Sequence, residues 1–243
     1  MNGQTREPAG ERPVLSARDI VKNYGGVRAL KGVNFDVYPG TVTTLFGENG
    51  AGKSTLMKIL SGVEKPTSGS IILDGEEVEF ADTNDARDHG ISIIHQELSL
   101  SPNISVRDNL FMGRELSRAG RVDDKEQERR SREVLAELGV QIAPRTKVSE
   151  LRLGEQQLVE IARALLADSR ILIMDEPTSA LSANEVGILF RVIDDLTAKG
   201  VAIVYISHHL EEALQVTDHA VVLRDGAMTA KAAAADIDLE WII

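Results

Sequence analysis

The stretch VTTLFGENGAGKS, residues 42–54, decides the fold of this chain. Residues 47–54 fit the phosphate-binding loop pattern G-x-x-x-x-G-K-[ST], between residues 42–46, which predict a strand, and residues 54–60, which predict a helix. Glycines let backbone N–H groups approach phosphates, Lys53 has the reach to contact the β and γ phosphates, and the Ser54 hydroxyl is a Mg²⁺ ligand. The stretch therefore predicts a nucleoside triphosphate site, with a ligand-free glycine-rich turn as the alternative.

Composition limits the classes of function that this chain can have. A length of 243 residues suits one domain, or one domain with a subdomain. The absence of cysteine excludes disulfides, thiol catalysis and zinc–thiolate sites, and it favours a reducing cytosol. A net charge of −11 opposes non-specific binding to nucleic acid or anionic lipid. No run approaches the roughly 18 apolar residues of a membrane span, so work at a membrane requires another chain to carry the spans.

The remaining pattern indicates alternating strands and helices after a polar start. Residues 1–13 predict a disordered leader. Residues 14–21 and 33–37 alternate as an antiparallel flap does, and Asp74-Gly75 after an apolar run suggests a hairpin turn. Further strands are predicted at residues 71–73 and 91–94, and helices at residues 105–138, 154–167, 184–199 and 232–235.

Two nearly continuous apolar runs, residues 171–174 and 201–206, predict buried parallel strands. Strands alternating with helices predict a doubly wound α/β core, in which residues 105–138 form a helical insertion. The charged run at residues 123–132 is typical of a solvated helix face and not of a binding patch. This organisation gives one domain over residues 14–243, with a helical subdomain at about residues 97–168.

The two buried runs end in polar residues, where ligands of such sheets bind. The first ends in Asp175-Glu176, in which one carboxylate can hold Mg²⁺ and the next can orient and deprotonate a water molecule. The second ends in Ser207-His208, which offers a donor to a γ-phosphate. An Asp at a strand end is often a turn or cap residue. Together with the phosphate loop, the pair predicts a hydrolytic site.

These motifs, in this order, resemble those of the ATP-binding-cassette (ABC) ATPases, and the resemblance extends from about residue 14 to residue 231. It implies a P-loop NTPase (RecA-like) core with a mostly parallel sheet, an antiparallel β flap and an inserted helical subdomain. It implies catalytic roles for Glu176, His208, Lys53 and Gln96, and Mg²⁺ contacts for Ser54, Gln96 and Asp175. It implies nucleotide binding by Tyr24, Gly47, Glu48, Asn49, Gly50, Ala51, Gly52, Lys53, Ser54 and Thr55, and by Arg152, Gly154 and Glu155 of the signature segment.

Some of these residues have an alternative interpretation without a functional role. Tyr24, which the resemblance stacks on adenine, could be an ordinary strand-edge aromatic. Gln96 alone would more often be a surface amide than a metal contact. The other histidines lack clustered metal-ligating partners and are interpreted as structural or exposed, and Trp241 is interpreted as a packing anchor.

The chain departs from the family pattern at two positions. The signature segment, residues 151–156, has Arg152 where the family has a serine that meets the γ-phosphate of ATP on a partner cassette. Arg152 either replaces the hydroxyl with a permanent cation or is too bulky for the interface to close. Gly154 and the helix start behind it keep part of an anion site. Ser182 stands where the corresponding family loop usually has Asp.

A finer resemblance is to bacterial sugar importers of the ribose and xylose type, carried by HQEL at residues 95–98, GEQQLVEIA at residues 154–162 and ISHHLEE at residues 206–212. Those relatives commonly carry two cassettes, so this chain is either a single-cassette member or a piece of a longer polypeptide. The resemblance implies an ATPase at the inner face of the membrane that powers a separate permease, pairs with a second cassette and indirectly serves a sugar-binding protein. A soluble ABC ATPase of translation or DNA repair and a regulatory cassette are the alternatives, and no nucleic acid is expected.

Overall fold

The computed structural model describes residues 12–95, 98–118, 120–167 and 169–237. The chain divides into two compact units. The first contains Met1–Ile93, Arg170–Glu176 and Ile193–Ile243, and the second contains Ile94–Ser169 and Pro177–Val192. Residues 1–11 of the expected leader, Gln96 and Trp241 lie outside the described residues. Within the described ranges, no helix is both long and apolar enough to cross a membrane.

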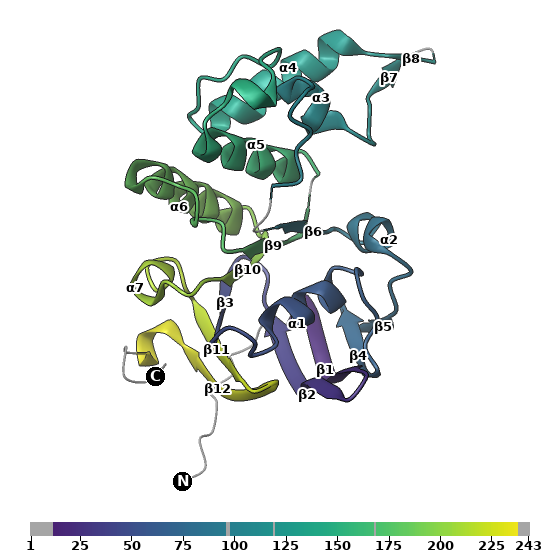
Figure 1. Ribbon diagram of the computed structural model, residues 1–243, viewed down its shortest axis with the longest axis vertical. Helices are drawn as coiled ribbons and strands as arrows, with labels where there is room; N and C mark the ends of the chain where they lie inside the picture. The colour runs from purple at the N-terminus through teal and green to yellow at the C-terminus, as the bar shows by residue number, and fades with distance from the viewer. Residues whose placement is uncertain (1–11, 96–97, 119, 168, 238–243) are drawn as a thin grey trace. The chain divides into compact units, whose positions relative to one another are not determined.

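A six-stranded sheet carries the strands that the apolar runs predict (Figure 1). Its order is β12-β11-β3-β10-β9-β6, and β3 pairs in parallel with both β10 and β11, while β10 also pairs in parallel with β9. The prediction of a mostly parallel central sheet is therefore confirmed. The strands are β3 (Val42–Phe46), β6 (Ile91–Ile94), β9 (Ile171–Asp175), β10 (Ala202–Ile206), β11 (His219–Arg224) and β12 (Ala227–Ala233).

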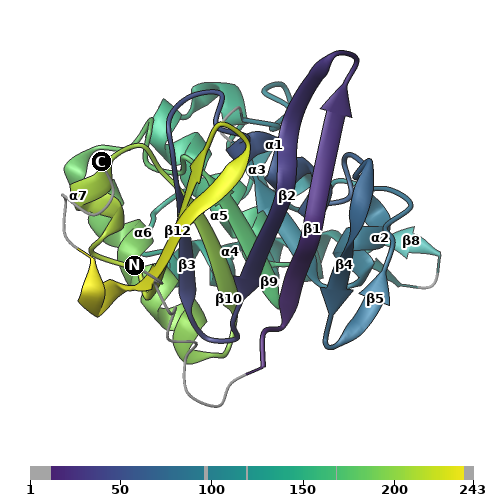
Figure 2. The ribbon, with the colours of Figure 1, turned by 90° about the horizontal axis from the view of Figure 1, so that it is seen from below.

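The predicted antiparallel flap is a second sheet of four strands in the order β2-β1-β4-β5 (Figure 2). Its hairpin turn falls at Asp74 and Gly75, as predicted, and both residues have positive φ, of 53° and 90°. Two residues with positive φ suit the twist of a tight hairpin. The strands are β1 (Leu15–Tyr24), β2 (Val27–Val37), β4 (Ser68–Leu73) and β5 (Glu76–Val78).

Helix α1 (Lys53–Leu60) shares one apolar core with both sheets. Leu56 and Leu60 of this helix are fully buried in the same cluster as Phe35 of β2 and Ile173 of β9. The phosphate loop, which joins β3 to α1, is thereby anchored at both ends in packed structure. Two shorter helices of this unit are α2 (Thr83–Asp88) and α7 (Leu210–Ala213).

The second unit is built on α3 (Val106–Phe111), α4 (Asp124–Glu137) and α5 (Leu153–Leu165), which pack on one another. The single helical pattern expected for residues 105–138 is wrong in its middle, where β7 (Ser117–Arg118) and β8 (Arg121–Val122) form a hairpin. The glycines explain the interruption, because Gly113 ends the first helix and Gly120 makes the turn, with φ of 74° and 76°.

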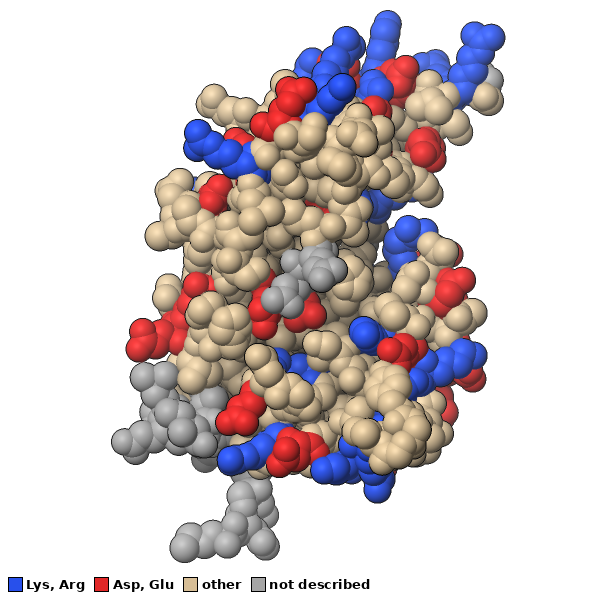
Figure 3. All heavy atoms as spheres, in the orientation of Figure 1, with Lys and Arg blue, Asp and Glu red and all other residues tan. Residues whose placement is uncertain are grey.

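The charged face of α4 is solvent-exposed, as the charge run predicts. Arg129 pairs with Glu126 and Glu133, and Arg132 pairs with Glu128, each with a nitrogen–oxygen distance of 2.5 Å. Figure 3 shows basic and acidic side chains mixed over this part of the surface. Such i,i+3 and i,i+4 pairs stabilise the helix by about 0.2–0.5 kcal/mol each. They also leave few unpaired charges on this face of the helix.

The end of the described chain differs from the expectation of a short helical piece at residues 232–235. Ala232 and Ala233 continue strand β12, which pairs with β11, and a 3₁₀ turn follows at Ala234–Asp236. Alanine has high helix propensity, but here the hydrogen bonds of an existing sheet edge determine the conformation. The remaining elements are the 3₁₀ turn Val148–Glu150 and helix α6 (Ala183–Ala198).

Candidate active site

Three neighbouring parallel strands bring the phosphate loop and the polar residues together at one sheet edge. The order β3-β10-β9 places the carboxyl ends of these strands side by side, and Ile206 of β10 stands in register with Asp175 of β9. The backbone N–H of Glu176 donates to the carbonyl of Ile206 at 3.0 Å, which ties the two strand ends. The loop after β3 begins at the same edge, so the geometry joins the motifs that the sequence separates.

The phosphate loop needs its glycines for both space and backbone conformation. Gly47 has φ of 152°, and a Cβ there would lie 2.3 Å from the carbonyl oxygen of Leu223. Gly52 has φ of 105°, and a Cβ there would lie 2.7 Å from the side chain of Leu30. Side-chain-bearing residues rarely adopt these conformations. The loop is therefore pressed against β11 and β2 and has one shape available.

Lys53 is the best-defined functional side chain of the loop. It is only 7% exposed, and its Nζ donates to the carbonyl oxygens of Gly47 at 2.8 Å and Glu48 at 3.0 Å. Burial lowers the pKa of this ammonium, and the nearby carboxylates of Glu176 and Asp175 act in the opposite direction. Its electrostatic coupling to Glu176 and Asp175 links the loop to the end of β9.

The middle of the loop is open to solvent. Glu48, Asn49 and Gly50 are exposed, Ala51 is buried, and its carbonyl accepts from the N–H of Gly226 at 3.0 Å. Ser54 and Thr55, which follow Lys53, stand in the first turn of α1, and they are exposed and half-buried respectively. A helix start with uncapped N–H groups and a flanking cation favours a bound anion.

Glu176 combines a carboxylate with an unusual backbone. Its φ is 48°, which costs a non-glycine residue about 1–2 kcal/mol and is concentrated at functional positions. The carboxylate Oε1 lies 3.0 Å from Nδ1 of His208, and the Glu176 side chain is only 14% exposed. Asp175 beside it is half-buried. The sequence did not predict this positive φ, because glutamate, unlike glycine, does not favour the left-handed region.

His208 completes this edge from the end of β10. Its ring also packs at 4.0 Å between centroids on the ring of His209, and the Ser207 hydroxyl accepts from the N–H of His209 at 2.9 Å. Ser207, predicted as a donor together with His208, is buried. The structure therefore brings together Lys53, Asp175, Glu176 and His208 of the predicted residues, all within the first unit.

Tyr24 is the last residue of β1, next to the tight turn Gly25-Gly26, and stands opposite Val27 of β2. Tyr24 is 43% exposed, and its hydroxyl donates a short hydrogen bond to Glu64. The Thr55 side chain in α1 lies near this hydroxyl and acts to lower its pKa, against the larger effects of burial and Glu64. Tyr24 is thus connected to the helix that carries the phosphate loop.

The signature residues lie in the second unit, at the start of α5. Arg152 is exposed at the N-cap position, where its own N–H donates to Oε2 of Glu155 at 2.8 Å. This is half of a capping box, since an arginine side chain cannot accept the reciprocal bond. Gly154 is buried, and a Cβ there would lie 2.5 Å from the carboxylate of Glu185.

Glu185 is a residue of this region that the sequence interpretation missed. It accepts from the N–H and the hydroxyl of Ser182, at 2.7 and 2.6 Å, and these bonds, with the charge of Arg152, hold the pKa of Glu185 below its usual range. Ser182, the second departure from the family pattern, thus stands directly before α6 and donates two hydrogen bonds to Glu185 in its first turn. The spacing Ser182-x-x-Glu185 is a capping signal that could have found this pair.

A phosphate-binding loop between a strand and a helix, with carboxylates at the end of a nearby parallel strand, defines a P-loop NTPase fold. The chain belongs to the ABC transporter family, whose sequence model matches residues 30–179. The fold agrees, since it matches a nucleotide-free ATP-binding cassette from an ABC transporter with a TM-score of 0.82 and 26% identity, over 91% of this chain and 92% of that one. An ABC cassette in its ADP conformation matches with a TM-score of 0.80 and 27% identity, over 91% of both chains.

Curated relatives include two proteins named ribose import ATP-binding protein RbsA. The protein from Rhodopirellula baltica is 53% identical over 216 residues, which are 88% of this chain and 42% of that protein. The protein from Clostridium perfringens is 48% identical over 237 residues, which are 96% of this chain and 47% of that protein. The chain therefore spans less than half the length of these relatives.

Proposed function

We propose that this cassette binds ATP with Mg²⁺ and hydrolyses it to ADP and phosphate. The observation that carries the proposal is the position of Lys53, a buried cation of the phosphate loop electrostatically coupled to the carboxylates of Asp175 and Glu176. Triphosphate binding, charge stabilisation and water activation then come from one sheet edge.

Each residue has a role that its chemistry suits. Lys53 contacts the β and γ phosphates, and the N–H groups of the loop surround them. Glu176 accepts a proton from the attacking water or orients it, and His208 contacts the γ-phosphate while bonded to Glu176. The oxygen ligands offered by Ser54 and Asp175 fit Mg²⁺, which when bound with the nucleotide would neutralise phosphate charge. Gln96, outside the described residues, is proposed as a further Mg²⁺ contact.

We further propose that the cassette powers import of a monosaccharide through a separate permease, as a peripheral subunit at the cytoplasmic side of the membrane. Support comes from the names of the relatives, which are ribose import ATP-binding proteins. A second cassette would place its own signature segment against this phosphate loop, in a two-fold arrangement. Arg152, Gly154 and Glu155 would contact nucleotide on that partner, and a sugar-binding protein would act through the permease.

Steady-state ATPase assays, with the chain alone and with the permease in proteoliposomes, test this function. Phosphate release that rises with the permease supports it. Light scattering adds a test of pairing, because a Glu176→Gln variant should be mainly monomeric without nucleotide and dimeric with ATP and Mg²⁺. A dimer insensitive to ATP would point to another interface.

A regulatory cassette that binds ATP without turnover is the second candidate, and Arg152 at the signature position is the observation that favours it. Nucleotide binding without phosphate release, in the presence of the permease, would establish this alternative. Restoring turnover by Arg152→Ser would attribute the loss to this residue.

A further inference from the structure

The side chains around Tyr24 form a connected cluster that the proposed chemistry does not use. The cluster consists of Lys22 and Tyr24 of β1 and Glu64 in the loop after α1, and we call it the Tyr24 cluster. Lys22 and Tyr24 stand two residues apart on one strand, so their side chains share a face of the sheet. All three residues belong to the first unit.

Glu64 is the centre of the Tyr24 cluster. Its Oε2 accepts the hydrogen bond from the hydroxyl of Tyr24 and lies 3.1 Å from Nζ of Lys22, while Oε1 lies 3.8 Å from Nζ of Lys58. The bond from Tyr24, with Lys22 and Lys58, holds the pKa of Glu64 below its usual range. Burial and Glu64 raise the pKa of the Tyr24 hydroxyl. Donor and acceptor therefore keep their roles across the neutral pH range.

Lys22 fixes the other side of the arrangement. Its Nζ lies 5.2 Å from the centroid of the Tyr24 ring, within the range of a cation–π contact, and donates to the carbonyl oxygen of Lys65 at 2.7 Å. The Lys22 side chain is mostly buried, whereas Tyr24 is 43% exposed. A cation thus lies over one face of the ring, and Tyr24 keeps enough exposed surface for a planar ligand to reach it.

A phenol ring at a strand end normally has rotational freedom, which is lost when a base stacks on it. We propose that Glu64 is a positioning residue, which holds Tyr24 through its hydroxyl in the orientation that accepts a nucleotide base, with Lys22 closing the opposite face. This inference rests on the proposed binding of ATP, together with the stacking of Tyr24 on adenine that the family resemblance implies. The role of Glu64 is to pre-organise that contact, and Glu64 itself does not touch the nucleotide.

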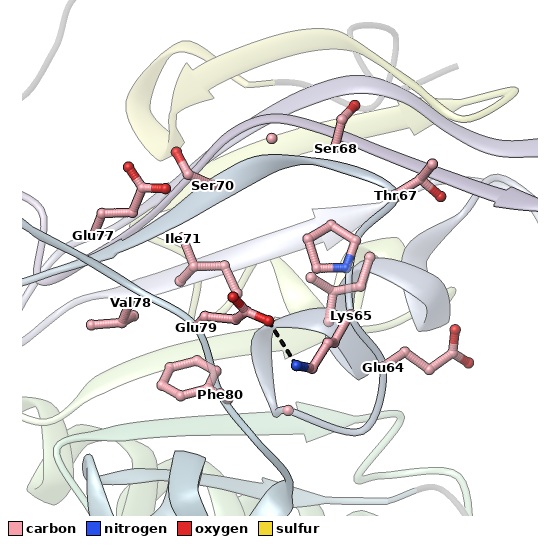
Figure 4. Close-up of a pocket in the computed structure, with 14 residues that line it drawn as sticks. Glu64, Lys65, Thr67, Ser68, Ser70, Ile71, Glu77, Val78, Glu79 and Phe80 are labelled. Carbon is pink, nitrogen blue, oxygen red and sulfur yellow. Dashed lines mark hydrogen bonds and ion pairs between the residues drawn. The ribbon is translucent and has the colours of Figure 1, made fainter.

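A nearby carboxylate provides a matched control. Figure 4 shows a pocket of about 230 Å³ beside β4 and β5, with Lys65 and Glu79 paired at 2.7 Å and the carboxylate of Glu64 pointing away from this pair. Glu79 is an exposed glutamate that pairs with Lys65, whereas the hydroxyl of Tyr24 donates to Glu64. Glu79→Ala therefore removes a carboxylate from the same pocket rim without touching the Tyr24 cluster.

The test measures affinities of the full chain for ATP and for inorganic tripolyphosphate by calorimetry, both with Mg²⁺. Glu64→Ala and Tyr24→Phe should each weaken ATP binding by about 2- to 10-fold, the range for an aromatic stacking contact, and leave tripolyphosphate binding unchanged. The double variant, Glu64→Ala with Tyr24→Phe, should bind ATP as tightly as either single variant, because both changes remove the same hydrogen bond. Glu64→Gln should retain more affinity than Glu64→Ala, since its amide oxygen still accepts, and Glu79→Ala should equal the unmodified chain.

Equal losses for ATP and tripolyphosphate would mean that Glu64 supports the phosphate loop, and would overturn the positioning role. Additive losses in the double variant, or unchanged ATP affinity in Glu64→Ala, would also overturn it. If Glu64→Ala does not fold, the losses of ATP and tripolyphosphate affinity are compared in the Glu64→Gln and Tyr24→Phe variants instead. An unmodified chain that binds neither ligand would instead overturn the proposed function, and the positioning role with it.

Discussion

Nδ1 of His208 lies 3.0 Å from Oε1 of Glu176, so the ends of two neighbouring parallel strands are joined through their side chains. The contact fixes the direction of a carboxylate whose backbone is already constrained by a φ of 48°. A general base must be held in one place relative to the water that it activates. The first two predictions concern this pair.

Glu176→Gln should keep ATP affinity and reduce phosphate release by about 10²–10⁴, the range for removal of a general base. The amide preserves the shape of the side chain and loses only its basicity. Calorimetry and steady-state phosphate release measure the two quantities. Glu211→Gln, an exposed residue on α7, is the matched control and should leave both unchanged. Normal turnover in Glu176→Gln would remove Glu176 from the role of base.

His208→Ala should also reduce phosphate release, and its effect should be much smaller when Glu176 is already Gln. The reason is that two residues acting as one unit have strongly non-additive effects. His209→Ala is the control, because His209 stacks on His208, whereas the contact with Glu176 comes from His208. Full additivity of the two changes would show that the 3.0 Å contact is catalytically irrelevant.

Lys53→Ala should lower ATP affinity itself, by at least about tenfold, because a charge-assisted hydrogen bond contributes about 1.5–3 kcal/mol. The change also leaves the carbonyl oxygens of Gly47 and Glu48 without their donor. Lys125→Ala removes the same charge from an exposed position of α4, away from the loop sequence, and serves as control. Calorimetry with ATP decides, and unchanged affinity would contradict the role given to Lys53.

Gly47→Ala should destabilise the fold by about 2 kcal/mol or more, because its Cβ would lie 2.3 Å from a backbone oxygen of Leu223. Gly50→Ala is the comparison within the same loop. Gly50 has φ of 83° but open space around a Cβ, so only the conformational cost of about 1–2 kcal/mol applies. Chemical denaturation measures both values. Equal losses would mean that the loop is not held against β11.

Arg152→Ser should raise ATPase activity coupled to the permease. The change restores the hydroxyl at the signature position and removes a bulky exposed cation, while Gly154 and the start of α5 are retained. Arg191→Ser, an exposed arginine of α6, is the control for loss of charge. A fall in coupled activity with unchanged ATP affinity of the isolated subunit would instead show that Arg152 contacts phosphate, through a bond about twice as strong as a neutral one.

The sequence predicted the elements whose apolar residues follow a regular pattern. The buried runs of β9 and β10 and the strand–loop–helix around Lys53 follow from apolar pattern and glycine spacing. Hairpin β7–β8 did not, because strands of two residues are too short to show alternation. Glu185 beside Gly154 was missed for a different reason. Their contact joins residues far apart in the chain, and nothing local in the sequence specifies which carboxylate fills the space over a glycine.

The backbone of Glu176 places two requirements on one residue. A φ of 48° suits glycine or asparagine, whereas the proposed chemistry requires a carboxylate. Pro177 follows directly and restricts the same residue further. Selection of this chain for heat resistance alone would therefore drive position 176 toward residues that relax the backbone and lose the base. Laboratory evolution of a more thermostable cassette would have to keep the codon for Glu176 fixed, since stability and turnover favour different amino acids at this position.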